Sequence, residues 1–208
     1  PDKLFIYEVN TWVWLSHLSQ RYNRAITLAN VPAKAIESLA RPNVDVIWMM
    51  GVWKRSEYAR AHALKYKHEY VRVLPDAQDD DIIGSAYSIA EYEVDERLGG
   101  REGLAAFRQQ LAKRGLRLIL DYVPNHIAVD HAWVHKQPKF IVRGKVKDLN
   151  ERRGDFFRHS GSNSGSTGGS NSGPNQQFNR RKPVLAHGRD PYFPGWTDTA
   201  QLNAFNPD

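Results

Sequence analysis

The sequence predicts an α/β fold in which parallel strands are joined by helical crossovers. Three short apolar segments, at residues 4–10, 44–50 and 116–123, have the length and the residue types of strands. Two segments with helical periodicity lie between them, at residues 33–40 and 101–114. This alternation favours parallel strands with right-handed crossovers, and a doubly wound sheet and a barrel both satisfy it.

Both predicted helices have recognisable ends. Asn30 and Pro32 form a helix-start signal, because Asn caps the first turn and Pro suits a position within it. The helix stops before Pro42, since the residue that precedes a proline avoids the helical conformation. The second helix, at residues 101–114, is followed by Gly115 in a position typical of a helix C-terminus.

The third apolar segment, at residues 116–123, predicts a buried strand with polar chemistry at its end. Asp121, Asn125 and His126 occur within a few residues of one another. Pro124 lacks an amide hydrogen, so the strand cannot continue as a regular central strand beyond it. Ligands bind at the carboxyl ends of strands in parallel sheets and barrels, and we therefore expect a functional site here.

The composition is that of an ordinary globular protein. The chain has 208 residues, of which 41% are hydrophobic and 25% charged. The net charge is +6, but the basic residues are dispersed, and the apolar runs are too short to cross a bilayer. We therefore expect no nucleic acid and no membrane as partner. Because the sequence has no cysteine, disulfides and thiolate metal sites are excluded.

Two further segments bear on domain organisation and location. Residues 160–174 consist only of Ser, Gly, Asn, Thr and Pro, which predicts a flexible linker. Residues 184–207 are aromatic and rich in proline, which predicts a loop-rich subdomain over the strand ends. The sequence begins with Pro1-Asp2-Lys3, without Met or a secretory signal pattern. This start indicates a processed chain or a fragment and slightly favours the cytoplasm, although it leaves the compartment open.

Residues 121–126, Asp-Tyr-Val-Pro-Asn-His, resemble the first conserved motif of the alpha-amylase family, glycoside hydrolase family thirteen. That motif, Asp-x-x-x-Asn-His, lies at the end of the third barrel strand. The segment that precedes this strand in the family is similar to residues 84–92 and 98–100 of this chain. The family's second strand is similar to residues 44–50. Residues 198–203 resemble the segment before its fourth strand. The ordered set covers most of the chain and is far more specific than one motif.

The resemblance implies a partial (β/α)8 TIM barrel, made of its first three strands, with an irregular insertion after the third. Residues 1–126 would be the N-terminal part of the barrel, and residues 127–208 an insertion subdomain that contains the linker at 160–174. A complete barrel needs about 250 residues. The expected partners are an α-glucan or α-glucoside substrate and the remaining C-terminal part of the barrel.

The resemblance also implies an enzyme that cleaves or transfers α-glucosidic bonds with retention of configuration. This chemistry needs two carboxylates, one as nucleophile and one as acid/base. In the family they lie on the fourth and fifth strands, which would follow Asp208. We therefore expect this chain to be the N-terminal portion of a glycoside hydrolase or transglycosidase, without catalytic residues of its own.

The resemblance assigns roles to four residues. His126 would bind sugar hydroxyls at the subsite of the cleaved glucose, and Tyr87 would stack on that sugar. Asp121 would position an arginine beside the nucleophile. Asn125 is a calcium ligand in many family members, so calcium is the one cofactor that the resemblance suggests as a candidate. Ser88 stands where the family commonly has Asp.

Other functions and roles remain open from the residues alone. The chain could be a non-catalytic amylase-like binding or interaction protein, because a fold does not guarantee a function. A metal-dependent hydrolase that uses Asp121, Asn125 and His126 is a third hypothesis. The structural alternatives are a salt bridge or turn cap for Asp121, an Asx turn for Asn125, and core positions for His126 and Tyr87.

Overall fold

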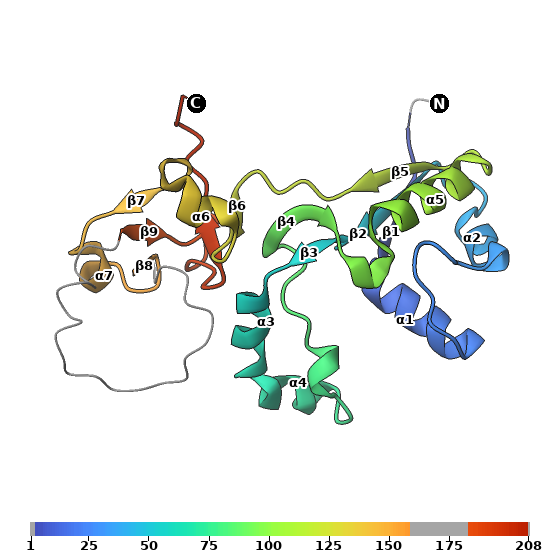
Figure 1. Ribbon diagram of the computed structural model, residues 1–208, viewed down its shortest axis with the longest axis horizontal. Coiled ribbons are helices and arrows are strands. Elements are labelled where there is room, and N and C mark those ends of the chain that lie inside the picture. The colour runs from blue at the N-terminus through green and yellow to red at the C-terminus, as the bar shows by residue number, and fades with distance from the viewer. Residues whose placement is uncertain (1–2, 159–182, 208) are drawn as a thin grey trace. The chain divides into compact units, whose positions relative to one another are not determined.

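The computed structural model describes residues 3–158 and 183–207 (Figure 1). The chain divides into two compact units, Pro1–Arg55 with Glu91–Tyr122, and Ser56–Ala90 with Val123–Asp208. The predicted linker at residues 160–174 lies outside the described residues. The predicted domain boundary between residues 126 and 127 stays a prediction.

A three-stranded parallel sheet forms the centre of the first unit. β1 (Ile6–Asn10), β2 (Val46–Met50) and β5 (Arg117–Leu120) lie in the order β1-β2-β5. Met49 of β2 pairs with Val9 on one side and with Leu120 on the other. The predicted parallel arrangement of the three strands is confirmed. Among the described residues these strands form an open sheet and no closed barrel.

Both predicted helices are present in the first unit. α2 (Ala33–Leu39) follows Pro32, and α5 (Gly100–Ala112) follows Gly99, which has the positive φ of 103° that glycine tolerates. A short 3-10 helix, η2 (Glu96–Leu98), precedes α5. The two crossovers β1-α2-β2 and β2-α5-β5 therefore follow the alternation that the sequence predicts.

The structure contains a helix in the first unit that the sequence analysis did not predict. α1 (Thr11–Tyr22) starts directly after β1, and the Asn10 side chain caps it by accepting a hydrogen bond from the Val13 amide at 3.3 Å. It ends at Asn23 in the left-handed conformation, with φ of 46°. Its apolar residues pack against the sheet, so α1 belongs to the same core.

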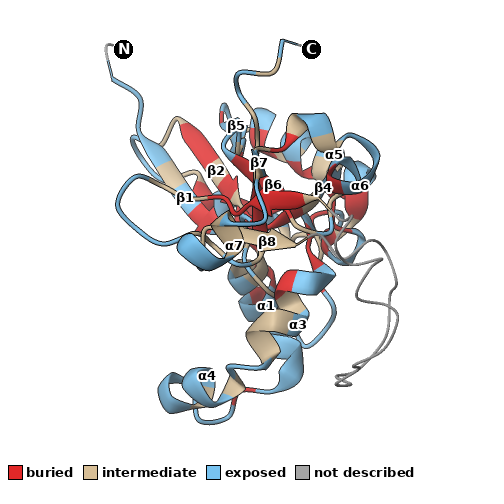
Figure 2. Ribbon diagram, turned by 90° about the vertical axis from the view of Figure 1, so that its left-hand side faces the viewer, coloured by how far each residue is buried: buried red, intermediate tan, exposed pale blue. Residues whose placement is uncertain are grey.

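The core of the first unit is centred on β2, which Figure 2 shows as mostly buried. Ile47 and Met49 of β2 and Phe107 and Leu111 of α5 are fully buried. The prediction that residues 116–123 form a buried strand is wrong in this respect, because Ile119 of β5 is 38% exposed. β5 pairs with β2 alone, so it is an edge strand of the described sheet.

The long connection between β2 and α5 is more ordered than the sequence predicts. It contains β3 (Trp53–Arg55) and β4 (Ile89–Val94), which pair in a two-stranded sheet. α3 (Glu57–Leu64), α4 (Lys67–Val73) and the 3-10 helix η1 (Asp79–Asp81) lie between these two strands in the chain. They belong to the second unit, and their own packing forms the cavity described below.

Two small antiparallel sheets organise the rest of the second unit. β6 (His126–Ala128) pairs with β10 (Thr199–Gln201), with His126 opposite Gln201. β7 (Arg143–Gly144) and β8 (Phe156–Arg158) flank β9 (Val184–Ala186). The loop-rich subdomain predicted for residues 184–207 therefore contains two strands, which pair with partners far away in the sequence.

A second hydrophobic core lies beneath these sheets. Its buried members are Ile127, Val134, Ile141, Leu185 and Ala200. The short helices of this region are α6 (Ala132–Lys136), η3 (Pro138–Phe140) and α7 (Asp148–Glu151). In the part of the chain that the structure describes, no helix is long and apolar enough to span a membrane.

Candidate functional site

Asp121 lies at the carboxyl end of β5, as the sequence predicts, and its side chain is buried. Its Oδ1 accepts a hydrogen bond from Trp48 Nε1 at 2.9 Å, and its Oδ2 accepts one from the Gly51 amide at 2.6 Å. The Asp121 carbonyl accepts a third from Trp53 Nε1 at 2.8 Å. The carboxylate therefore joins the ends of the neighbouring strands β2 and β5.

A buried arginine, Arg55, interacts electrostatically with Asp121. Burial lowers the pKa of Arg55 to about 10, against the charges of Asp95 and Asp121, which raise it. The guanidinium of Arg55 lies over the ring of Trp12, 5.3 Å from its centroid. Arg55 thus keeps its charge at neutral pH, and Asp121 is one of the carboxylates that compensate it. The sequence interpretation missed this arginine.

His126 begins β6 and is buried against Trp196, with 5.0 Å between the ring centroids. Burial lowers the pKa of His126, and a hydrogen bond with the Tyr87 backbone and the charge of Asp198 oppose this shift. The imidazole is therefore neutral at neutral pH. Its Nδ1 lies 3.1 Å from the amide nitrogen of Asn125.

The hydrogen bonds of Asn125 identify which ring nitrogen of His126 carries the proton. Asn125 Oδ1 accepts from Gln201 Nε2 at 2.9 Å, and Asn125 Nδ2 donates to the Arg189 carbonyl at 3.3 Å. The amide group thus turns its NH2 toward His126, whose Nδ1 accepts. We assign the proton of the neutral imidazole to Nε2 on this basis.

Tyr87 lies in the turn that precedes β4, and its side chain is 40% exposed. Its amide donates to Ser85 Oγ at 3.2 Å. The next residue, Ser88, is fully buried, and its hydroxyl donates to the Asp198 carbonyl at 3.0 Å. The ring of Tyr87 is therefore accessible for stacking, while Ser88 holds its turn to the segment before β10.

The sequence interpretation missed a second buried histidine near Asp198. His187 Nδ1 donates to the Thr199 carbonyl at 2.9 Å, and its ring stacks on Phe157 at 4.5 Å. Burial lowers the pKa of His187, against the charges of Asp198 and Asp155. No local pattern marks His187, because its environment is created by the pairing of distant strands.

The structure places the four predicted site residues in two groups. Tyr87, Asn125 and His126 belong to the second compact unit, where the Tyr87 backbone and the Asn125 side chain both interact with His126. Asp121 belongs to the first unit. The hydrogen bonds of each group are satisfied within its own unit.

The hydrogen bonds of Asn125 bear on the calcium that the resemblance suggests. Hard cations need several oxygen ligands, and the amide oxygen of Asn125 is already an acceptor for Gln201. No group of three or more His, Cys, Asp or Glu side chains in residues 3–158 and 183–207 could hold a metal ion. Calcium at Asn125 therefore stays an expectation from the resemblance.

The comparison with protein families decides the identity of the fold. Residues 36–193 match the model of the alpha amylase catalytic domain. The chain belongs to the alpha-amylase family. This match confirms the resemblance that the motif at residues 121–126 predicts, and it extends over both compact units. A comparison with curated proteins gave no match.

Solved structures of alpha-amylase-family enzymes have a similar fold. A trehalose-6-phosphate hydrolase from Bacillus licheniformis is 14% identical over 98% of this chain and 30% of its own, with a TM-score of 0.56. A trehalulose synthase is 15% identical over the same shares, also with a TM-score of 0.56. The present chain thus spans less than a third of the length of these enzymes.

Acidification should destabilise the second unit. The folded-state pKa values of His126 and His187 lie below the ordinary value of 6.5, so the unfolded chain binds more protons just below that pH. The free energy of unfolding should therefore fall as the pH drops from 6.5 toward the lower folded-state values. Urea unfolding across this range, followed by Trp fluorescence, measures it.

The control for this prediction is a variant that lacks both buried imidazoles. The double substitution His126→Gln and His187→Gln should flatten the pH dependence below 6.5, whereas His17→Gln on the exposed surface of α1 should leave it unchanged. An equal pH dependence in all three proteins would contradict the assignment of the two buried imidazoles as neutral.

Proposed function

We propose that this chain is the N-terminal, substrate-binding portion of a retaining glycosidase or transglycosidase that acts on α-glucosidic bonds. The observation that carries the proposal is the family match over residues 36–193, which includes Tyr87, Asp121 and His126 in the family's order. An α-glucan or α-glucoside is then the substrate.

The geometry of the second unit supports sugar binding by His126 and Tyr87. Because Nδ1 of the neutral imidazole accepts from Asn125, the Nε2 proton is the group that His126 can donate to a sugar hydroxyl. The accessible ring of Tyr87 offers an apolar face to the pyranose. Because His126 is hydrogen-bonded to the Tyr87 backbone, the two groups keep a defined mutual position.

Asp121 acts in this proposal as a positioning residue. It holds the ends of β2 and β5 together through Trp48 and Gly51, and it compensates part of the charge of Arg55. The family role of this position, the orientation of an arginine beside the nucleophile, is part of the same proposal. That arginine would come from a later strand.

We propose that the nucleophile and the acid/base lie outside these 208 residues. The support is the coverage of the solved enzymes, since the chain aligns over 98% of itself but only 30% of theirs. The 208-residue chain alone should therefore not hydrolyse a nitrophenyl α-glucoside above the uncatalysed rate. A chromogenic assay with the purified chain tests this, with the longer protein as positive control. Turnover by the chain that is lost on substitution of one of its own carboxylates would contradict it.

The edges of the described sheet support a partner made of further strands. β1 and β5 each pair only with β2 in the described part of the chain. Leu4, Phe5 and Ile6 at β1 are each at least half exposed. Unpaired strand edges with apolar side chains favour association with another strand. We propose that the remaining strands of the barrel cover them.

The isolated 208-residue chain should therefore associate in solution. Light scattering coupled to size-exclusion chromatography should show species larger than a monomer, and their fraction should rise with protein concentration. The reason is that a closed barrel has no free edges, whereas an open sheet has two. The double substitution Phe5→Lys and Ile6→Lys should reduce association, and the double substitution Tyr192→Lys and Phe193→Lys, at two exposed residues outside the sheet, serves as a control of equal charge change. A monomer that persists at every concentration would contradict the proposed partner.

A further inference from the structure

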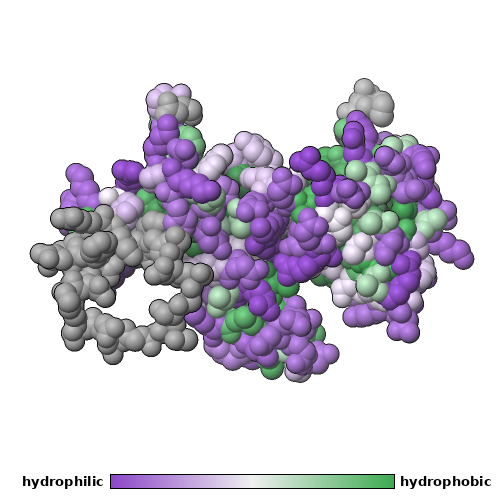
Figure 3. Space-filling model, in the orientation of Figure 1, coloured by the Kyte–Doolittle hydropathy of each residue, from purple (hydrophilic) through white to green (hydrophobic). Residues whose placement is uncertain are grey.

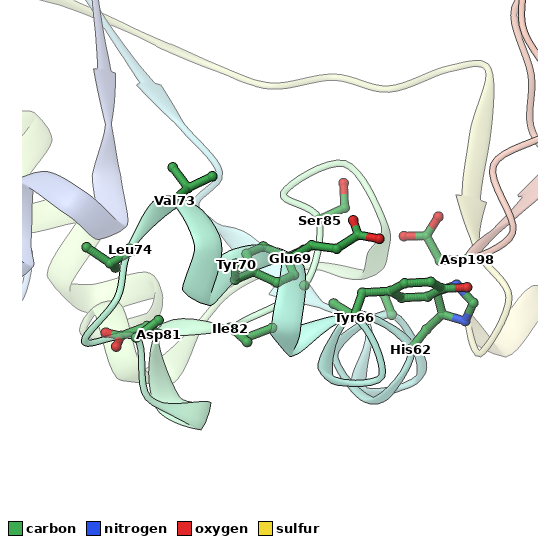
Figure 4. A pocket seen from close by; sticks show the side chains of 14 residues that line it. His62, Tyr66, Glu69, Tyr70, Val73, Leu74, Asp81, Ile82, Ser85 and Asp198 are labelled. Carbon is green, nitrogen blue, oxygen red and sulfur yellow. The ribbon is translucent and has the colours of Figure 1, made fainter.

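A cavity of about 800 Å³ lies within the second unit and is separate from the proposed sugar-binding residues. α3, α4 and η1 form most of its wall, and Ser85 and Asp198 complete it (Figure 4). Neither Tyr87 nor His126 belongs to its described lining. Its volume is within the range of small-molecule sites, which hold about 300–1,000 Å³. The proposed function assigns no ligand to this cavity.

A large part of the cavity wall is apolar. Ala59, Ala77 and Ile82 line it and are at most 5% exposed, so they form a buried apolar floor. Val73 and Leu74 of α4 also line it and are exposed, and Figure 3 shows hydrophobic residues at the surface around α4. An aliphatic group that enters the cavity would leave water for these apolar atoms, which favours its binding.

Polar groups and aromatic rings converge at one place in the same cavity. In Figure 4 the side chains of Glu69, Ser85 and Asp198 point toward a common space beside the ring of Tyr66. Tyr66 and Tyr70 are 44% and 46% exposed, so their rings are accessible to a ligand. Carboxylates accept hydrogen bonds, and the face of an aromatic ring attracts a cation. The combination therefore suits a positively charged hydrogen-bond donor.

The ring of Tyr66 is held in place before any ligand arrives. It packs against His62 of α3, with 5.4 Å between the ring centroids. His62 in turn stacks on Tyr58 at 6.3 Å, and its Nε2 lies 3.2 Å from the hydroxyl oxygen of Thr197. A ring that is already ordered costs less entropy when a ligand binds.

The local charge of the cavity is negative, although the chain as a whole has a net charge of +6. Glu69, Asp81 and Asp198 line it, and its described lining includes neither Lys nor Arg. Arg60 and Lys67 of the same helices are each paired with an aspartate of η1. The cavity therefore attracts a cation and repels an anion.

The apolar floor and the acceptors together select an organic cation of a particular kind. An inorganic cation would gain nothing from the floor, whereas an alkylammonium ion would place its chain there. A primary ammonium is a compact charge with three N–H donors, which can bond several acceptors at once. A quaternary ammonium has no N–H group and would leave the acceptors without donors.

We infer that this cavity is a binding site for a primary alkylamine. The ammonium group donates hydrogen bonds to Glu69 and Asp198 and lies over the ring of Tyr66. The alkyl chain packs against Ala77 and Ile82. Such a ligand is not an α-glucoside, so this site is additional to the proposed function.

Hexylamine is the probe, and a ligand-observed NMR titration of the 208-residue chain at neutral pH measures its affinity. Hexylamine should bind at least about 10-fold more tightly than hexanol, which lacks the charge. It should also bind more tightly than hexyltrimethylammonium, which lacks the N–H groups. N-acetyl-lysine methylamide carries the same ammonium on a peptide unit. It should bind more weakly than hexylamine, because its polar amides would meet the apolar floor.

Glu69→Gln and Tyr66→Leu should each weaken hexylamine binding by about 3-fold, and the double variant by about 5- to 10-fold. Both side chains are exposed enough for the variants to fold, which thermal unfolding verifies. The matched control is the double variant Glu57→Gln and Tyr192→Leu, at exposed positions outside the cavity lining. This control should bind hexylamine like the wild type.

Several results would overturn the inference. If hexylamine does not bind, or binds equally to the cavity variant and the wild type, the cavity is not its site. If hexanol binds as tightly as hexylamine, the cavity is an apolar site without selectivity for a cation. Tighter binding of hexyltrimethylammonium would contradict the hydrogen bonds to Glu69 and Asp198. Tighter binding of N-acetyl-lysine methylamide would replace the free amine by a lysine side chain of another protein. The test involves no sugar, so its result is independent of the proposed function.

Discussion

In the full-length enzyme that we propose, His126→Ala is expected to lower kcat/KM for an α-glucoside by roughly 30- to 1,000-fold, or about 2–4 kcal/mol. The physical reason is the loss of a neutral imidazole that presents its Nε2 proton to the sugar while Nδ1 accepts from Asn125. Burial against Trp196 and the hydrogen bond from Asn125 hold this ring in place before substrate arrives. The loss should therefore appear in kcat as well as in KM.

Steady-state kinetics measure this effect, with His17→Ala on the exposed side of α1 as the matched control. Because His126 is also bonded to the Tyr87 backbone, part of the effect could come from a displaced Tyr87 turn. His126→Gln, which keeps one donor and one acceptor, should recover part of the activity if hydroxyl recognition is the cause. An unchanged kcat/KM in a folded His126→Ala protein would assign His126 to a structural role.

Asp121→Ala is expected to lower the free energy of unfolding by about 3 kcal/mol, since it leaves one buried and one half-buried donor without an acceptor. These donors are Trp48 Nε1 and the Gly51 amide, which the carboxylate now binds at 2.9 and 2.6 Å. Loss of the negative charge also leaves Arg55 less compensated. The two effects act on the same end of the sheet, so they should reinforce each other.

Equilibrium urea unfolding of the 208-residue chain measures this loss, with Trp fluorescence as the signal. Asp80→Ala is the matched control, because the Asp80 side chain is fully exposed and should change stability by less than about 0.5 kcal/mol. The loss of unfolding free energy in Asp121→Asn should lie between those of Asp121→Ala and Asp80→Ala, since the amide keeps one acceptor oxygen. A stability equal to that of the wild type would show that the carboxylate does not join β2 to β5.

The sequence alone was sufficient for the parallel α/β arrangement of the first unit. The segments at residues 44–50 and 33–40 became β2 and α2 because their hydrophobic periodicity is local and matches the face that they bury. The family was also recognisable, since the motif at residues 121–126 is contiguous. α1 was missed although Asn10 marks its start, because its apolar residues directly follow a strand of similar composition.

Only the tertiary structure decided which groups contact one another. β5 has the composition of a buried strand but is an edge strand of the sheet that the described residues form, because burial depends on neighbouring strands and not on the strand's own residues. The neutral state of His126 depends on its burial, and the groups that interact with it are Tyr87, Asn125 and Asp198, the last of which lies beyond a long intervening segment. The cavity of α3 and α4 likewise closes on Asp198. Contacts over such sequence separations follow from strand pairing and packing, which no local pattern in the sequence encodes.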